Sequence, residues 1–405
     1  MKIGRLIGSV AALAAVPFLA IGAYYHSRRA TISTLKKITS FDSPYNLYSM
    51  EVKYDYDLDR IVERTLPDDA SCFDAMLKEA IPFIPVHVKA PMFGCSAFTL
   101  SGKESGVLMG RNYDFKNNTS ALLVRTNPKS GHRSIAFAAL DNLSANVPEN
   151  DLKFMFSGLA APFVCLDGLN EKGVSIAVLT LDSTPTRQFE PKKTLFTTMA
   201  IRLVLDRAAS TQEAVDLLSQ YNMFATSGRD YHFYITDAAG DGRVVEFDCD
   251  KDWRPMVVTP TRSVTNFFVM YKDKVLPFQH NGEYGHGRER YDAIESILSA
   301  HENEALSNKQ AAWEALRASS QEPKEGDVTS NTQWSIVYDN QNFSGEVSIR
   351  RNWDVVYRFD RNVRHFKVVA EHCARRKQSS HNVPLCLLGS SLVSHSLKKG
   401  LLRGV

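Results

Sequence analysis

The pattern of apolar and polar residues becomes strongly β-like from Cys95 onward. Short apolar or alternating runs are separated by turn sequences such as "TNPKSGH", "LNEKG" and "DAAGDG". These runs predict strands near residues 96–101, 106–113, 120–126, 133–139, 174–181, 232–237, 243–248, 262–267, 333–339, 343–350 and 355–359. The sequence "ITDAAGDGRVVEFD" predicts a β-hairpin.

Helical periodicity interrupts the strands in two places. Apolar residues at helical spacing predict helices over 195–209, 210–221, 288–300 and 307–318. Ser210 with Glu213, and Ser307 with Gln310, have the spacing of capping boxes at helix starts. Because strands, helices and strands follow one another without a βαβ rhythm, the sequence predicts an α+β fold with helices on antiparallel sheets.

The first 94 residues differ from the rest. Lys2 and Arg5 precede an apolar run from Leu6 to Tyr25, and basic residues close it. The run is longer than a usual signal-peptide core and close to the roughly 20 residues that span a bilayer. Both flanks are charged, so the sequence predicts export, with cleaved signal peptide and retained anchor both open. Residues 30–94 predict one strand and one or two short helices beside the main domain.

Composition narrows the function classes. The 405 residues are 44% hydrophobic and 23% charged, as expected for a globular protein with a sizeable core. The formal net charge of +3 is too small to indicate nucleic-acid binding. From His372 onward the chain has basic residues and no acidic ones, so the predicted folded body is mildly acidic. The basic tail is read as a solvated end, with attraction to an anionic membrane surface as the alternative.

The six cysteines give no sign of a metal site. They stand at positions 72, 95, 165, 249, 373 and 386, without Cys-x-x-Cys spacing or histidines at metal-site intervals. In an oxidising compartment two or four of them could form disulfides. No metal and no cofactor are therefore expected.

Cys95 stands at the head of a predicted hairpin. If residues 101–106 form the loop, Cys95 lies opposite Asn112, with Arg111 and Asp114 close on the facing strand. Strict alternation puts Arg111 and Asp114 on opposite faces, so the strand must end or bulge near Tyr113 for both to serve one site.

This trio suits nucleophilic catalysis by a thiol. A guanidinium lowers the pKa of a nearby thiol, and the thiolate is the nucleophile. No histidine lies nearby in sequence to act as the base. A cut between Gly94 and Cys95 would free an α-amine with a pKa near roughly 8, which can serve as the base for its own side chain. The alternative is a buried strand cysteine beside a structural ion pair.

The stretch "CSAFTLSGKESGVLMGRNYDF" resembles the nucleophile hairpin of the choloylglycine hydrolase superfamily, the linear amide C–N hydrolases with an N-terminal cysteine nucleophile. The family pattern is Cys, then Ser or Thr, a glycine-containing turn, and Gly-Arg-Asn-x-Asp, and it places Arg111 and Asp114 at matching positions. The similarity extends over about residues 92–360, through "DGLNEKGVSIAVLTLDS", "YHFYITDAAGDGRVVEFD", "SVTNFF" and "WSIVYDNQNFSGEVSIR".

The resemblance implies a four-layer αββα sandwich of antiparallel sheets and no cofactor. It implies that Asn266 is the asparagine that helps to bind the oxyanion, and that Arg288 is the counterpart of the later active-site arginine. Bile salt hydrolases have an asparagine where this chain has Thr180, whose hydroxyl could donate the same bond. Thr180, Phe98, Tyr113 and Phe267 are the candidate substrate-binding residues. The implied domains are 1–27, signal peptide or anchor; 28–94, pro-segment; 95–368, hydrolase domain; 369–405, basic tail expected to be disordered.

The implied activity is hydrolysis of a linear, non-peptide amide in a small N-acyl compound, through an acyl-enzyme on Cys95. The long segment before the cysteine resembles the arrangement of the lipid-amide members, and the location implied is extracytoplasmic. Which acyl amide, membrane association and oligomeric state stay open. Two alternatives remain: a processing-deficient, membrane-tethered homologue that binds a ligand, and a papain-like peptidase built on Cys95, His232 and Asn266.

Overall fold

The structure is a computed structural model in which every described residue belongs to one compact unit within Met1–Glu371. It describes residues 22, 24–39, 45–81, 93–102, 106–116, 118–147, 151–280, 282–302, 307–326, 330–360 and 367–369. The predicted signal or anchor segment and the basic tail fall almost entirely outside these ranges. Among the helices described, none is both long and apolar enough to cross a bilayer.

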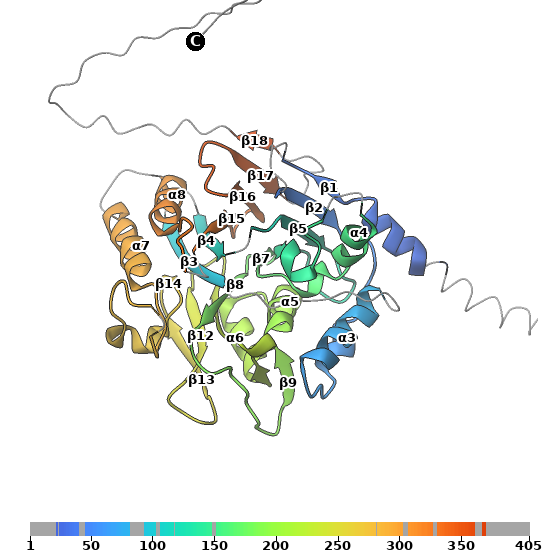
Figure 1. The fold of residues 1–405 in the computed structure, drawn as a ribbon, viewed down its shortest axis with the longest axis horizontal. Coiled ribbons are helices and arrows are strands. Elements are labelled where there is room, and N and C mark those ends of the chain that lie inside the picture. Colours follow the sequence, from blue (N-terminus) through green and yellow to red (C-terminus); the bar gives the residue numbers. More distant parts are fainter. Residues whose placement is uncertain are drawn as a thin grey trace, which may run out of the picture. The chain divides into compact units, whose positions relative to one another are not determined.

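Two large sheets form the centre of the fold (Figure 1). The nine-stranded sheet has the order β1-β2-β5-β6-β7-β8-β11-β12-β13. Its strands are β1 (Lys36–Lys37), β2 (Leu47–Glu51), β5 (Ala121–Thr126), β6 (Ser134–Ala139), β7 (Asp167–Asn170), β8 (Ser175–Leu181), β11 (Asp230–Thr236), β12 (Arg243–Phe247) and β13 (Met256–Pro260). β2 pairs with β5 in parallel, and the other pairs in this sheet are antiparallel.

The seven-stranded sheet has the order β14-β3-β4-β15-β16-β17-β18 and is antiparallel throughout. Its strands are β14 (Ser263–Val264), β3 (Phe93–Gly102), β4 (Gly106–Phe115), β15 (Thr332–Asp339), β16 (Ser344–Ile349), β17 (Val356–Asp360) and β18 (Lys367–Val369). A separate parallel pair is formed by β9 (Lys193–Phe196) and β10 (Tyr221–Phe224).

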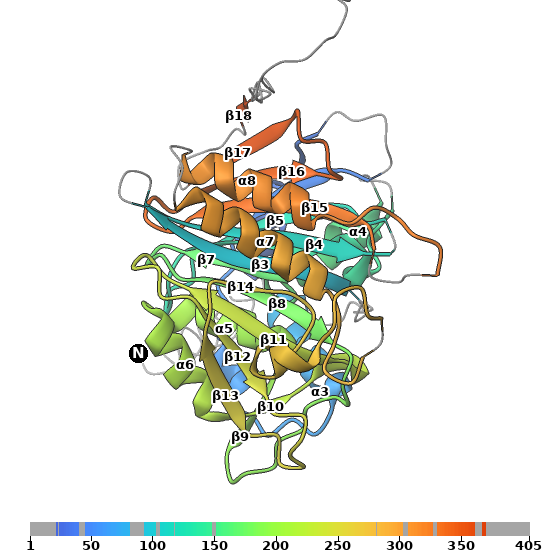
Figure 2. The ribbon, with the colours of Figure 1, turned by 90° about the vertical axis from the view of Figure 1, so that its left-hand side faces the viewer.

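Side-chain bonds show that the two sheets face each other. Tyr234 on β11 donates to Thr99 Oγ1 on β3 at 2.8 Å, and Tyr338 on β15 donates to Asp167 on β7 at 2.5 Å. Helices cover the outer faces. α7 (Arg288–His301) and α8 (Asn308–Ser319) lie side by side over β3 and β4 (Figure 2), and α5 (Thr197–Arg207) and α6 (Thr211–Ser219) contact the nine-stranded sheet. The predicted α+β fold and its layered sandwich are confirmed, except that β2 joins its sheet in parallel.

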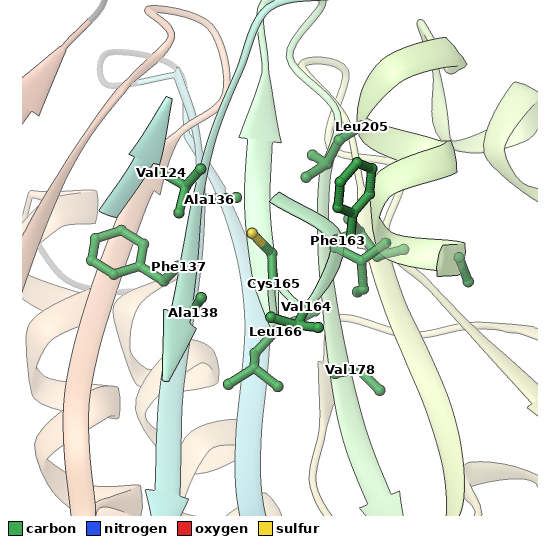
Figure 3. Close-up of a cluster of buried hydrophobic side chains, with 14 of the residues drawn as sticks. Val124, Ala136, Phe137, Ala138, Phe163, Val164, Cys165, Leu166, Val178 and Leu205 are labelled. Atoms are coloured by element: carbon green, nitrogen blue, oxygen red, sulfur yellow. The ribbon is translucent and has the colours of Figure 1, made fainter. Parts of the chain in front are cut away.

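The outer layers form where the sequence predicts helices. Ser307 and Gln310 form the predicted capping box of α8, and the Ser210 side chain accepts the Glu213 N–H at the start of α6. Apolar residues beneath α5 fill the space against its sheet. Figure 3 shows part of this core, where the Cys165 side chain lies among Val124, Ala136, Phe163 and Leu205. Cys165 is therefore a core residue.

The chain before Cys95 is more than a segment packed beside the domain. It includes a helix over residues 24–32, the strands β1 and β2, and the helices α2 (Asp59–Val62) and α3 (Asp69–Ala80). β2 lies inside the nine-stranded sheet, between β1 and β5 (Figure 1). The sequence does not predict the place of β2 in this sheet, because parallel pairing with a strand that is distant in sequence leaves no local pattern.

Candidate active site

Cys95 lies in the interior of β3, between β14 and β4, and none of its surface is exposed. It pairs with Tyr113 on β4. Two residues further along β3, Ala97 pairs with Arg111. Residues that pair directly share a face of the sheet. The thiol and the Arg111 side chain therefore point to the same side, toward the nine-stranded sheet.

The predicted register is wrong by one residue. Pairing continues to Gly102 and Gly106, so the turn is shorter than the predicted six-residue loop, and Tyr113 replaces Asn112 opposite Cys95. β4 also runs on through Asp114 without a bulge of its own. The irregularity lies instead in β15, between Thr332 and Trp334.

The main chain of Cys95 is held by side chains from two other elements. Its N–H donates to Asn266 Oδ1 at 2.7 Å, and its carbonyl accepts Arg290 Nη1 at 2.8 Å. Arg290 Nη2 donates to the same Asn266 Oδ1 at 2.8 Å. Asn266 Nδ2 donates in turn to the Thr180 carbonyl at 2.9 Å and to its hydroxyl at 3.4 Å. Asn266 thus joins Cys95 to the end of β8.

Arg111 is the cation beside the thiol. Its Nε donates to Asp167 Oδ2 at 3.3 Å and its Nη2 to the Val178 carbonyl at 2.8 Å, so a fully buried guanidinium is fixed from the facing sheet. Burial raises the pKa of the Cys95 thiol to about 12, while Arg111 opposes that rise by favouring the thiolate. The uncut chain consequently keeps its thiol protonated near neutral pH.

Asp114 points to the opposite face from the thiol, as strict alternation requires. Thr332 Oγ1 donates to Asp114 Oδ1 at 2.6 Å and Gln321 Nε2 to Oδ2 at 2.8 Å, while Arg290 Nη1 lies 3.6 Å from Oδ2. Burial raises the pKa of the Asp114 carboxyl, and Arg290 is the strongest of the groups opposing the rise. Arg290 therefore connects Asp114 to the Cys95 carbonyl.

Arg288 is not brought to Cys95. Its side chain bonds Asp292 at 2.8 Å and the Lys272 carbonyl at 2.7 Å, whereas Arg290, two residues later, bonds the Cys95 carbonyl. A signal for Arg290 was present, because it lies one helical turn before the buried Ile294 of α7.

Two of the candidate substrate-binding residues face away from the thiol. Phe98 lies on the alternate face of β3, packed in the cluster with Ile294 and Leu298 of α7, where its ring covers Gly110. Phe267 packs edge-on against Tyr291. Tyr113 does share the face of Cys95, but it is fully buried and stacks on Trp334 with ring centroids 4.2 Å apart. Of the four candidates, Tyr113 lies opposite Cys95 and Thr180 bonds Asn266.

The papain-like arrangement is not present. His232 bonds Glu246 through Nδ1 and the Thr265 carbonyl through Nε2, both at 3.0 Å, so both ring nitrogens are engaged. Cys72, Cys95, Cys165 and Cys249 are free thiols. The two remaining cysteines lie outside the described residues. Within the described ranges, His, Cys, Asp and Glu side chains form no group of three that could hold a metal ion.

A pair of substitutions separates the two arginines. We expect Arg290→Lys to lower amide hydrolysis roughly a hundredfold, since one ammonium cannot reach both the Cys95 carbonyl and Asn266 Oδ1. Arg288→Lys, on a half-exposed ion pair, should leave the rate within about twofold. Steady-state kinetics on both variants checks this, and equal losses would contradict the assignment of Arg290.

The chain is similar to known proteins in part of its sequence and in its fold. Residues 95–252 match the family model of linear amide C–N hydrolases, choloylglycine hydrolase family. No curated protein matches the chain in sequence. Among solved structures, penicillin V acylase from Agrobacterium tumefaciens is 17% identical with a TM-score of 0.47, over 66% of this chain and 86% of that one. A mutant conjugated bile acid hydrolase from Clostridium perfringens is 15% identical with a TM-score of 0.49, over 68% and 96%.

The matched segment begins at Cys95 and includes Arg111, Asp114, Asp167 and Thr180. The family predicted from the hairpin sequence is thereby confirmed. Residues 95–252 thus match the choloylglycine hydrolase family of linear amide C–N hydrolases, and this match supports a hydrolase that acts on linear amide C–N bonds.

Proposed function

We propose that this protein is an N-terminal-nucleophile amidase that hydrolyses a small N-acyl compound, with Cys95 as the nucleophile after a cut between Gly94 and Cys95. The observation that carries the proposal is the grip on the Cys95 main chain. Its nitrogen bonds Asn266 and its carbonyl bonds Arg290, from elements that do not depend on the preceding residues. An α-amine freed at this nitrogen would keep these anchors.

The cut would also open the way for a substrate to reach the Cys95 thiol. In the uncut chain β3 begins at Phe93, and Phe93 and Gly94 pair with Phe115 and Asp114. Cys95 is fully buried in that state. Attack of Cys95 Sγ on the Gly94 carbonyl moves the acyl group from nitrogen to sulfur, and water then releases the upstream chain and restores the thiol. This frees the α-amine.

The hydrolytic cycle uses the same groups. The α-amine accepts the thiol proton, and the thiolate attacks the substrate's amide carbonyl. The amine then protonates the leaving nitrogen, which departs as the C–N bond breaks and leaves a thioester on Cys95. Water, deprotonated by the same amine, hydrolyses the thioester. Arg111 stabilises the thiolate, and Asn266 positions the amine through its Oδ1.

A substrate panel tests the function. Processed protein is incubated with N-acyl amides that differ in acyl length and leaving group, including a bile conjugate and a phenoxyacetyl amide. We expect release of amine from at least one of them. A thiol-reactive acyl probe should label Cys95 in the same preparation. Folded, processed protein that neither hydrolyses any member nor reacts with the probe would favour the ligand-binding homologue instead.

In the proposal, the apolar N-terminal run directs the chain out of the cytoplasm.

A further inference from the structure

The segment from Thr265 to Met270 carries Asn266 but has little regular structure to hold it. β14 ends at Val264, and the 3-10 helix η4 (Val269–Lys274) begins three residues after Asn266. Between them, Phe267 makes an isolated bridge to Gly285, and the His286 N–H donates to the Asn266 carbonyl at 2.8 Å. Further support for the position of the Asn266 side chain must come from contacts made outside a regular ladder.

A buried pair on the nine-stranded sheet provides those contacts. His232 on β11 and Glu246 on β12 bond each other at 3.0 Å, and both side chains are completely buried. His232 Nε2 bonds the Thr265 carbonyl at 3.0 Å. Glu246 accepts the N–H groups of Val269 and Met270 at 2.7 and 3.1 Å. One pair of side chains thus grips the segment on both sides of Asn266.

The hydrogen bonds of this pair constrain where its hydrogens lie. A carbonyl oxygen only accepts, so Nε2 of His232 must carry a hydrogen. A second hydrogen lies between Nδ1 and Glu246 Oε1, which are 3.0 Å apart. Every bond of the buried pair is then satisfied, and the pair has no net charge.

We propose that the hydrogen-bonded His232–Glu246 pair is the positioning device for Asn266, and through it for the Cys95 α-amine. The inference rests on the proposed function, because it gives the pair a catalytic purpose. His232 and Glu246 touch neither substrate nor thiol in this role. Their contribution is to hold the Thr265 and Val269 ends so that Asn266 Oδ1 stays 2.7 Å from the Cys95 nitrogen. Loss of that hold displaces the asparagine amide.

Nuclear magnetic resonance of protein labelled with 15N-histidine and 15N-asparagine tests the device without any substrate. In the wild type we expect Nε2 of His232 to carry a hydrogen, assigned by the signals lost in His232→Gln. The Asn266 side-chain amide signals should shift in His232→Gln and in Glu246→Gln. His280→Gln, at an exposed histidine, is the matched control and should leave them unchanged.

Kinetics gives the second readout. In folded His232→Gln and Glu246→Gln, kcat should fall roughly ten- to a hundredfold with KM nearly unchanged, because a misplaced catalytic group slows the chemical step more than binding. Asn266 signals that do not move in a folded variant overturn the proposal. If the wild type hydrolyses no amide, the proposed function fails, while the amide signals still decide whether the pair positions Asn266. Having two variants keeps the test valid if one does not fold.

Discussion

Replacing Cys95 with alanine should leave the chain uncut and abolish amide hydrolysis. Both reactions need the same sulfur, first to attack the Gly94 carbonyl and then the substrate. Removal of a catalytic nucleophile costs on the order of a million-fold in rate. The thiol is fully buried, and the uncut strand already has its full ladder with β4, so Cys95→Ala should fold like the wild-type precursor. Intact-mass measurement after expression, followed by a hydrolysis assay, checks both parts.

Cys249→Ala is the matched control. Cys249 is free and half-buried in the turn after β12, and we assign it no part in the site. This variant should be cut and should hydrolyse substrate like the wild type. If Cys95→Ala is cut as efficiently as the wild type, cleavage is due to another protease and the self-processing mechanism is wrong. If the wild type is never cut at this bond, the terminal amine cannot be the base.

Local sequence signals predicted the hairpin that brings Cys95 and Arg111 together. The spacing from Cys95 to Arg111 identified the hairpin, because a hairpin brings residues at fixed separations together. The register was missed by one residue because turn length depends on backbone geometry, which "SGKESG" does not determine. In the observed register Asn112 does not lie opposite Cys95. Its side chain points to the outer face of the sheet, where it bonds Ser319 and the Leu316 carbonyl of α8.

Non-local partners account for the other misses. Phe98 was a candidate for substrate contact because it lies three residues from Cys95, but alternation directs it toward α7 and α8. His232 was noticed only for its order in the sequence relative to Cys95 and Asn266. Its pairing with Glu246 depends on β11 lying beside β12 in register, and its bond to Thr265 depends on the packing of the two sheets. The hydrophobic periodicity of a single segment cannot predict such contacts between residues that are distant in sequence.

The chain upstream of Cys95 should stay bound after the cut. β2 is hydrogen-bonded along its length to β5, and Tyr54 and Tyr56 are buried and donate to the Leu159 carbonyl at 2.5 Å and to Asp206 at 3.0 Å. Loss of this segment would expose an edge of the sheet and leave Asp206 without one of its partners. In gel filtration under reducing conditions we therefore expect both pieces to elute together. Cys72 is a free thiol, so no disulfide involving it is needed.

A substitution within β2 tests whether the association comes from this packing. Met50→Asp places a carboxylate at a position that is 1% exposed, and should lower the free energy of unfolding by more than about 3 kcal/mol. Glu51→Gln, on the same strand but exposed, should change it by less than about 1 kcal/mol. Denaturant unfolding of both variants measures the difference. Release of the upstream piece from wild-type protein without denaturant, with the remainder still folded and active, would show that the strand contributes little. Retention would instead mean that any N-terminal anchor continues to hold the catalytic chain after the cut.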